Sequence, residues 1–283
     1  MMQESISERE FAFTAADFEK VKGLIHRHAG IALSDSKQNM VYSRLGRRLR
    51  ALKLQRFDDY LELIEDGKGE EWQSFVNSLT TNLTSFFREE HHFPILASLL
   101  KSLSGRGEIR LWCSASSTGE EPYSIAITAR EALGTNASRV KILATDIDTN
   151  VLETAQRGIY PEESVARLDE KLVRRYFLQG GGDKGGLIRV KPEVQSLVSF
   201  RQINLLAPKW PLSQQYDAIF CRNVMIYFDR PTQRGVLEKF APLLQPHGRL
   251  FIGHSESLGY ARDLFELDGR TVYRAAKSTF PAA

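Results

Sequence analysis

From residue 108 onward, short apolar runs alternate with amphipathic segments of helical length. The runs EIRLWC (108–113) and VKILATDI (140–147) are predicted strands, and PYSIAITAREAL (122–133) and TNVLETAQRG (149–158) are the predicted helices that follow them. This alternation is typical of parallel strands with helices on both faces of the sheet. We therefore predict an α/β fold built on a doubly wound, mostly parallel sheet. Later elements are expected at 197–206, 216–228, 231–244, 248–255 and 265–277.

The chain before this alternation is predicted to form a small helical domain. Val41, Leu45, Leu49 and Leu52 recur at helical spacing and would bury one side of a helix. The predicted boundaries are 1–75 for the N-terminal helical domain, 76–95 for a linker that contributes to the ligand site, and 96–283 for the α/β domain.

The rhythm of strands and helices is interrupted between about residues 158 and 203. The helical segment EESVARLDEKLVRRYF is followed there by the flexible loop GGGDKGG and by two extended pieces, GLIRV and QSLVSF. We predict that this stretch forms a small antiparallel β-subdomain inserted into the α/β domain.

Composition and charge limit the classes of function. With 283 residues, 42% of them hydrophobic, the chain can bury a large core, and it has no apolar run of membrane-spanning length. The N-terminus lacks the pattern of a signal peptide, so we expect a cytoplasmic protein. The formal net charge of +3 does not indicate nucleic-acid binding. Cys113 and Cys221 are expected to be buried, and His91 and His92 to begin a helix and bind no metal.

The turn between the first strand and its helix reads SASSTGEEPYS (114–124). In open α/β sheets, ligands bind at the carboxyl ends of the strands, beside such a turn. This turn has neither of the glycine patterns that hold phosphates, and Glu120 and Glu121 would repel a pyrophosphate. Opposite unit charges about 4 Å apart attract by roughly 4 kcal/mol at an effective dielectric near 20. We therefore expect a ligand that is cationic or rich in donors.

S-adenosyl-L-methionine meets this requirement, because it carries an ammonium, a sulfonium and two ribose hydroxyls but no phosphate. Asp146 ends the second strand, about 25 residues after Glu121, where a carboxylate can accept both hydroxyls. The alternative is structural: Glu120 and Glu121 would complement the helix dipole, and Asp146 would cap the next helix.

Five blocks follow one another along the chain: TTNLTSFFRE (80–89), SASSTGEEPYSIAI (114–127), ATDIDTNVLETAQRGIY (144–160), YDAIFCRNVMIYFD (216–229) and GHSES (253–257). They resemble the bacterial chemotaxis receptor methyltransferases, the CheR family, and the likeness runs from about residue 20 to residue 274. The resemblance implies a class I S-adenosylmethionine-dependent methyltransferase fold. It also implies methyl transfer to glutamate side chains of chemoreceptors, which gives glutamyl methyl esters and S-adenosyl-L-homocysteine.

The same resemblance implies roles for individual residues. Asn82, Thr84 and Arg88 would reach the cofactor from the linker. Glu121 and Asp146 would hold its methionine and ribose parts, and the adenine side would be lined by Asn204, Leu205, Arg222 and Asn223.

Methyl transfer to a carboxylate requires placement more than a strong base, because glutamate is already ionised near pH 7. We therefore expect no metal, and we predict Arg88 and Tyr227 as the catalytic residues. Arg88 would orient the substrate carboxylate, and Tyr227 would donate a hydrogen bond or wall the methyl path. The structural alternatives are an ion pair of Arg88 with Glu89 or Glu90, and a packed ring for Tyr227.

Substrate recognition is expected from two regions. By resemblance the receptor presents acidic helices, which the arginines Arg44, Arg47, Arg48 and Arg50 would bind in a salt-dependent way. Alternatively, the acidic segment 57–72 would neutralise these arginines. The inserted β-subdomain would, again by resemblance, bind a C-terminal tail peptide of the receptor as an added strand. We expect a monomer that does not enter the membrane.

Two other classes of function are considered. An S-adenosylmethionine-dependent RNA methyltransferase would also use a basic helix, but the chain has no Asn/Asp-Pro-Pro-Tyr motif and little net charge. A non-catalytic sensor or scaffold would bind the cofactor without turnover. Arg88 and Tyr227 favour an enzyme over this last class.

Overall fold

The chain divides into two compact units, of which the first ends at Thr81 and the second begins at Asn82. The structure, a computed structural model, describes residues 9–276. Within these residues, no helix is both long enough and apolar enough to cross a membrane.

The described part of the first unit is helical. Its α-helices are α1 (Ala15–Ala29), α2 (Gln38–Leu52), α3 (Phe57–Leu63) and α4 (Gly69–Leu79), with a short 3₁₀ helix, η1 (Asp35–Lys37), before α2. α1 begins at a capping box, in which the side chains of Thr14 and Asp17 each accept from the other's backbone N–H. The predicted stripe on α2 is confirmed for Val41, Leu45 and Leu49, which are fully buried.

A seven-stranded sheet forms the centre of the second unit, in the order β6-β2-β1-β7-β8-β10-β9. Its strands are β1 (Ile109–Cys113), β2 (Val140–Asp146), β6 (Val198–Gln202), β7 (Tyr216–Cys221), β8 (Leu244–Ile252), β9 (Phe265–Gly269) and β10 (Val272–Ala275). β6, β2, β1, β7 and β8 are parallel, and β10 and β9 add an antiparallel edge. The predicted mostly parallel sheet is confirmed. The strand order reverses between β1 and β7, which is where such sheets bind ligands.

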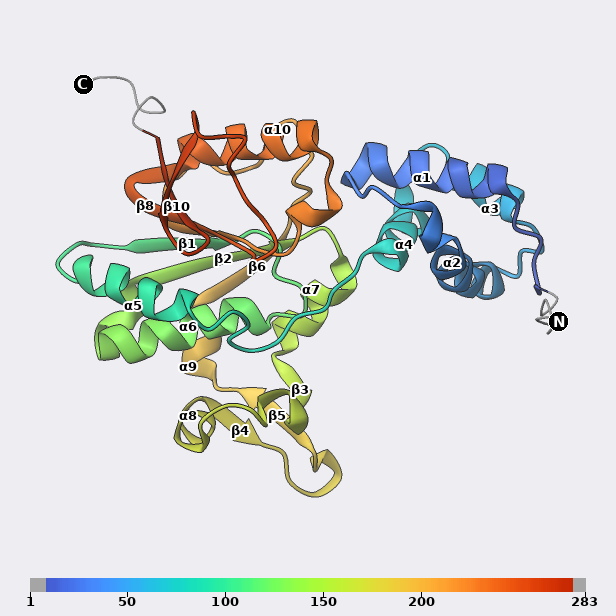
Figure 1. Cartoon of the computed structure of the whole chain (residues 1–283). Coiled ribbons are helices and arrows are strands. Elements are labelled where there is room, and N and C mark those ends of the chain that lie inside the picture. Colours follow the sequence, from blue (N-terminus) through green and yellow to red (C-terminus); the bar gives the residue numbers. More distant parts are fainter. Residues whose placement is uncertain (1–8, 277–283) are drawn as a thin grey trace, which may run out of the picture. The chain divides into compact units, whose positions relative to one another are not determined.

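Helices cover both faces of this sheet (Figure 1). They are α5 (His92–Ser102), α6 (Glu120–Leu133), α7 (Thr149–Arg157) and α10 (Arg230–Phe240). Alternate strand residues enter two separate cores: Leu111 and Cys113 of β1 pack with α5 and α6, whereas Trp112 packs with α10. The short 3₁₀ helices are η2 (Gly134–Arg139), η3 (Glu162–Val165), η4 (Gly182–Lys184), η5 (Met225–Tyr227) and η6 (Ala241–Leu243).

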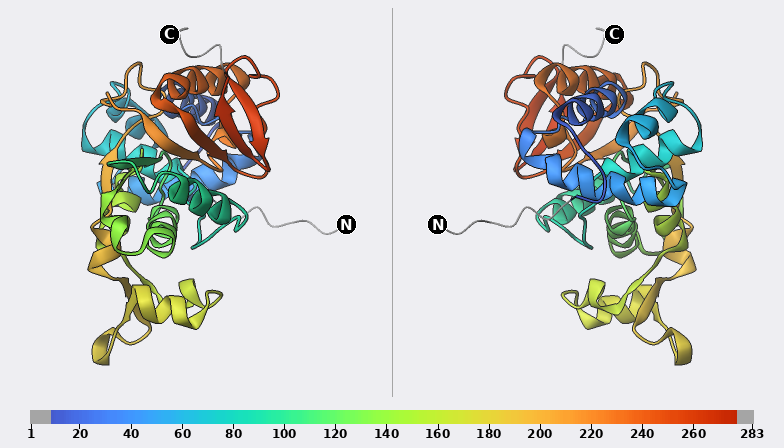
Figure 2. Two further views of the ribbon diagram at one scale, coloured as in Figure 1. Left: turned by 90° about the vertical axis from the view of Figure 1, so that its left-hand side faces the viewer. Right: turned by 90° about the vertical axis from the view of Figure 1, so that its right-hand side faces the viewer.

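A small antiparallel sheet is inserted between α7 and β6, and Figures 1 and 2 show it projecting away from the main sheet. It consists of β3 (Ile159–Pro161), β4 (Phe177–Gln179) and β5 (Leu187–Val190), in the order β3-β5-β4, with α8 (Glu170–Tyr176) before β4 and α9 (Pro192–Gln195) after β5. The predicted inserted β-subdomain is confirmed as an antiparallel sheet.

The extended piece QSLVSF does not belong to this insertion. Its second half, residues 198–200, lies in β6, which pairs in parallel with β2 from Ile142↔Val198 to Asp146↔Gln202. The prediction that 195–200 forms part of the appendage was therefore wrong. β6 is a half-exposed edge strand of five residues, so its sequence pattern does not distinguish it from a strand of the insertion.

Candidate functional site

The turn after β1 lies at the carboxyl end of the parallel strands. Ser116 N donates to Thr145 O at 2.8 Å, and Ser114 N donates to Phe220 O at 2.8 Å, so the turn is fastened to both neighbouring strands. Gly119 has φ of 101°, and a Cβ there would lie 2.7 Å from the hydroxyl of Tyr160. Only glycine fits this position, which sets the start of α6.

Asp146 lies at the end of β2, directly beside this turn. Its Oδ2 accepts from Ser117 N at 2.8 Å, and its Oδ1 accepts from Asp148 N at 3.0 Å. Burial raises the pKa of Asp146 to about 6. The alternative that Asp146 caps the next helix is wrong, because Asp148 is the N-cap of α7 and accepts from its first backbone N–H groups.

Glu120 and Glu121 begin α6 and have different partners. Glu121 Oε2 accepts from Arg222 Nη1 at 2.5 Å, and Glu121 Oε1 accepts from the thiol of Cys113 at 3.2 Å. Glu120 accepts from the hydroxyl of Thr118 at 2.6 Å, and burial raises its pKa. Glu121 is therefore paired with the cation of Arg222, whereas Glu120 is held by the Thr118 hydroxyl.

Arg222, the residue after β7, lies behind the turn with its side chain only 1% exposed. Besides Glu121, its guanidinium donates through Nη2 to Arg88 O at 2.5 Å and lies 3.4 Å from Glu89 Oε2. It thus joins β7, α6 and the segment before α5. The assignment of Arg222 to the adenine side, implied by the resemblance, stays a prediction.

The segment from Asn82 to His91 runs along the turn. Asn82 O accepts from Ser117 Oγ at 2.9 Å, and Phe87 N donates to Ser124 Oγ at 2.9 Å. Arg88 is half-buried, and its Nη1 donates to Leu83 O at 2.8 Å, which closes a compact loop. Half-buried Thr84 lies inside this loop sequence. Among the ion pairs found in residues 9–276, none joins Arg88 to either neighbouring glutamate.

Glu89 pairs instead with residues that follow the strands. Its Oε1 accepts from His254 N at 3.1 Å, His254 Nδ1 at 2.8 Å and Asn223 Nδ2 at 3.2 Å. Burial would raise the pKa of Glu89, but the hydrogen bonds from His254 and the charge of Arg222 lower it to about 2. Sequence reasoning considered Glu89 only as a partner of Arg88.

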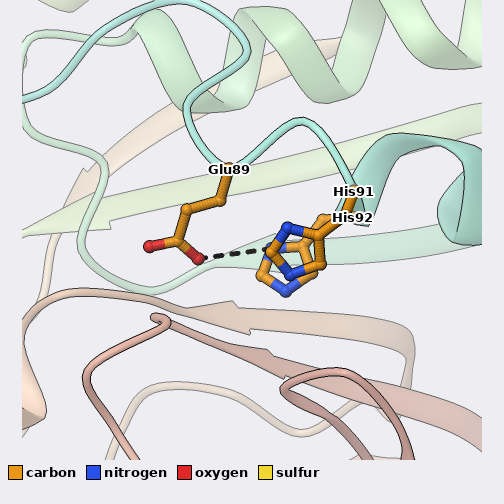
Figure 3. Close-up of side chains that lie close together, drawn as sticks. All are labelled: Glu89, His91 and His92. Atoms are coloured by element: carbon orange, nitrogen blue, oxygen red, sulfur yellow. Dashed lines mark ion pairs between the residues drawn. The ribbon is translucent and has the colours of Figure 1, made fainter.

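Glu89, His91 and His92 lie together, as Figure 3 shows, with one ligand atom of each within 4.8 Å of the others. His92 Nδ1 is 3.8 Å from Glu89 Oε2, and His92 Nε2 is 2.8 Å from the hydroxyl of Thr271. Burial, with the nearby charge of Arg222, lowers the pKa of His92 to about 3, so its ring is neutral. Because the arginine lies 3.4 Å from the same Glu89 oxygen, a metal cation here would meet a positive charge. The expectation of no metal stays a prediction.

Glu256 shapes the loop after β7. Its carboxylate accepts from Asn223 N at 3.0 Å, Met225 N at 2.8 Å and Gly253 N at 2.5 Å. This holds Asn223 in a left-handed conformation, with φ of 56°, and it sets the course of η5 as far as Tyr227. Tyr227 is half-buried and packs on the edge of the second core. Sequence reasoning quoted GHSES but did not single out this acid.

Asn204 and Leu205 follow β6 on the same side of the sheet. Ile203 N donates to Asp146 O at 3.1 Å, so this loop begins beside Asp146. Asn204 Oδ1 accepts from Leu206 N at 2.8 Å, and Leu205 is buried in the second core. The predicted adenine-side loop therefore adjoins the predicted ribose carboxylate.

Negative charge exceeds positive charge in this region. Of the four carboxyl groups around the turn, those of Glu89 and Glu121 pair with Arg222, whereas Asp146 accepts from backbone N–H groups and Glu120 from the Thr118 hydroxyl. Ser116 Oγ is fully buried in the turn and has no hydrogen-bond partner within the described residues. An unsatisfied hydroxyl beside excess carboxylate fits a ligand that brings hydrogen-bond donors and positive charge.

The predicted substrate-binding arginines lie on α2, in the first unit. Arg48 pairs with Glu71 of the acidic segment at 2.5 Å, as the alternative reading proposed. Arg44 donates to backbone carbonyls at the end of α4, and Arg50 pairs with Glu10 at 2.8 Å. Arg47 is exposed.

Comparison with known proteins gives matches along both units. Residues 16–80 match the family model "CheR methyltransferase, all-alpha domain", and residues 82–274 match "CheR methyltransferase, SAM binding domain". A chemotaxis protein methyltransferase of Escherichia coli is 51% identical over 267 residues, covering 94% of this chain and 93% of that protein. Chemotaxis protein methyltransferase 2 of Pseudomonas aeruginosa is 51% identical over 269 residues, covering 95% and 96%. The expected class I methyltransferase fold is confirmed, and the chain belongs to the CheR methyltransferase family.

Proposed function

We propose that this protein transfers the methyl group of S-adenosyl-L-methionine to glutamate side chains of chemotaxis receptors. The products would be glutamyl methyl esters and S-adenosyl-L-homocysteine. The carrying observation is the turn after β1, where excess carboxylate, the unsatisfied hydroxyl of Ser116 and buried Asp146 meet at the carboxyl edge of the sheet. These mainly acceptor groups suit a cationic ligand with ribose hydroxyls and oppose a phosphorylated one.

Cofactor binding would use both charge and shape. Asp146 would accept the ribose hydroxyls, and Glu121 would lend negative charge to the methionine end. Asn82 and Thr84 would cover the cofactor from one side, and Asn204, Leu205 and Asn223 would flank adenine. Arg222 would act from behind, because its buried guanidinium holds Glu121 and the Arg88 carbonyl in place.

The chemistry requires little from the protein beyond placement. When bound, the cofactor supplies a methyl group on a positively charged sulfur. One carboxylate oxygen of the substrate forms the new O–C bond as the C–S bond breaks, so opposite charges are neutralised and no proton moves. Arg88 would orient the carboxylate, and Tyr227 would confine the methyl path. A poorly hydrated pocket favours such a charge-neutralising step.

Receptor docking would use the first unit. Arg47 is exposed on α2 and would meet the acidic receptor helix, whereas Arg48 pairs with Glu71 and the exposed Arg50 would have to exchange Glu10 for the receptor. The resulting attraction would be long-range and salt-sensitive.

The inserted sheet would bind a receptor-tail peptide as an added strand. β3 and β4 are the two edges of the small sheet, and Ile159, Leu178 and Leu187 expose apolar side chains on it. We expect an immobilised receptor-tail peptide to retain the wild-type protein and to lose it on Leu178→Glu. If the wild-type protein passes through unretained, this part of the proposal fails.

The deciding experiment for the overall proposal is transfer of radiolabelled methyl groups to membranes that contain chemoreceptors, beside a matched reaction with total RNA. Label in the receptor band that mild alkali releases as methanol identifies a glutamyl ester. Alkali-stable label in RNA would replace this proposal with RNA methylation. Binding of the cofactor with no transfer to either substrate would favour a sensor or scaffold.

The pKa of Asp146 predicts how cofactor binding depends on pH. Ribose hydroxyls donate to the ionised carboxylate, and in the free protein this group is protonated below about pH 6. We expect affinity for S-adenosyl-L-methionine to be constant above that pH and to fall by up to about tenfold for each pH unit below it. Calorimetric titration from pH 8 to pH 5 measures this. Asp146→Asn should bind more weakly and lose the pH dependence, and an unchanged profile in that variant would exclude Asp146 as the titrating group.

A further inference from the structure

A small, partly open cavity of about 100 Å³ lies in the second unit, and its lining residues Met225 and Ile226 directly precede Tyr227 in the chain. It is lined by η5, the start of α10 and the end of β8 with the loop that follows. The lining residues are Met225, Ile226, Arg230, Gln233, Ile252, Ser255, Glu256, Ser257, Leu258 and Tyr260.

The polar groups of the cavity are mainly hydrogen-bond donors. The Arg230 guanidinium lies 4.3 Å from the centre of the Tyr260 ring, and Arg230 Nη1 donates to Gln233 Oε1 at 3.1 Å. The hydroxyl of Tyr260 is buried beside the Arg230 guanidinium, and its own O–H donor has no acceptor within residues 9–276. Ser255 and Ser257 add two exposed hydroxyls. An arginine held in place and an unsatisfied phenol together fit a carboxylate.

Besides its hydroxyls, the cavity has two side chains with carboxylate or amide oxygens, and the oxygens of both already accept hydrogen bonds. Glu256 carries a negative charge, but its oxygens accept from three backbone N–H groups, which offset that charge. Gln233 turns its carbonyl oxygen to Arg230 and donates its amide to Met225 O at 2.9 Å and Phe228 O at 3.0 Å. Gln233 therefore fixes the direction of the arginine, whose other N–H groups provide the positive charge of the cavity.

The position of the cavity relates it to the methyl acceptor. Ile226, which is 51% exposed on its wall, directly precedes Tyr227, and consecutive Cα atoms are about 3.8 Å apart. Side chains one turn apart on a helix have Cβ atoms about 5–6 Å apart. A helical substrate whose glutamate reaches Tyr227 would therefore bring a neighbouring side chain to the cavity. The volume holds about three water molecules, or one carboxyl group with a methylene.

We propose that this cavity is a specificity site that binds the carboxylate of a second acidic side chain on the receptor, within one helical turn of the glutamate that accepts the methyl group. The inference rests on the proposed function and adds the preference that this enzyme would show among receptor glutamates. Arg230 would pair with that carboxylate, and the Tyr260 hydroxyl would donate a second hydrogen bond.

The first test is Arg230→Met in the full chain, assayed for methyl transfer to a chemoreceptor in membranes. We expect kcat/KM for the receptor to fall about tenfold or more, while the KM for S-adenosyl-L-methionine stays unchanged. Tyr260→Phe should also lower kcat/KM for the receptor, but by a smaller factor. Arg234→Met is the matched control, because Arg234 lies one turn along α10 and pairs with Asp263 and Glu238 outside the cavity. A melting curve for each variant shows that it folds.

The second test identifies the side chain that fills the cavity. Each acidic residue within one turn of the methylated glutamate is replaced in turn by its amide. One replacement should lower kcat/KM with wild-type enzyme and cause no further loss with Arg230→Met. Wild-type kinetics for Arg230→Met, or additive losses at every position, would overturn the specificity site and leave methyl transfer intact. A wild-type enzyme that transfers no methyl to receptors would overturn the proposed function itself.

Discussion

Arg88→Ala is expected to lower kcat for receptor methylation about 100-fold or more and to leave the fold intact. The guanidinium is half-buried, and its hydrogen bond is to the carbonyl of Leu83, which is 80% exposed and can be rehydrated when the arginine is lost. The fold therefore depends little on this side chain. Turnover depends on it if the guanidinium orients the substrate carboxylate.

The measurement combines single-turnover methyl transfer with cofactor binding and thermal unfolding. Arg88→Lys is the matched control, because it keeps the charge but not the planar pair of donors, and we expect it to recover only part of the rate. A loss of cofactor affinity without a loss of turnover at saturation would leave Arg88 as a cofactor residue only. Full turnover in Arg88→Ala would remove it from the mechanism.

Arg222→Met is expected to lower the free energy of unfolding by about 3–5 kcal/mol and to abolish tight cofactor binding. The arginine is 1% exposed and lies between the carboxylates of Glu121 and Glu89. Without it, two buried acids face each other with no cation between them, and the Arg88 carbonyl loses its donor. The pKa of Glu89 should then rise from its low value, since one of the groups that lower it is gone.

Urea unfolding at pH 7 measures this change, and the matched control is Arg234→Met. That arginine also pairs with two acids, but on the exposed surface, where an ion pair contributes little. Both variants remove one positive charge, so a difference between their free energies of unfolding measures the effect of burying the ion pairs. Equal stability of Arg222→Met and wild type would show that the buried network is not a structural support.

Local sequence patterns were enough to predict the alternation of strands and helices, the N-terminal helical domain and the place of the ligand turn. These features are local, because the hydrophobic periodicity and the order of elements depend on residues that are close together in the sequence. The turn after β1 and Asp146 could be found in this way, since every parallel strand ends at the same edge of the sheet. The family blocks pointed to the same positions.

Which side chains meet depends on how distant parts of the chain pack in three dimensions. Arg222 and Glu121 are 101 positions apart, and Asn223 and Glu256 are 33 apart, so no local pattern pairs them. β6 belongs to the main sheet because its backbone pairs with β2. The sequence pattern of a short, half-exposed strand does not indicate which strand it will pair with. Asp146 does not cap α7, because Asp148, two residues later, is the N-cap of that helix. Strand order and burial determine the partner of each charge, and here they pair Glu121 with Arg222, two residues whose predicted cofactor contacts stay predictions.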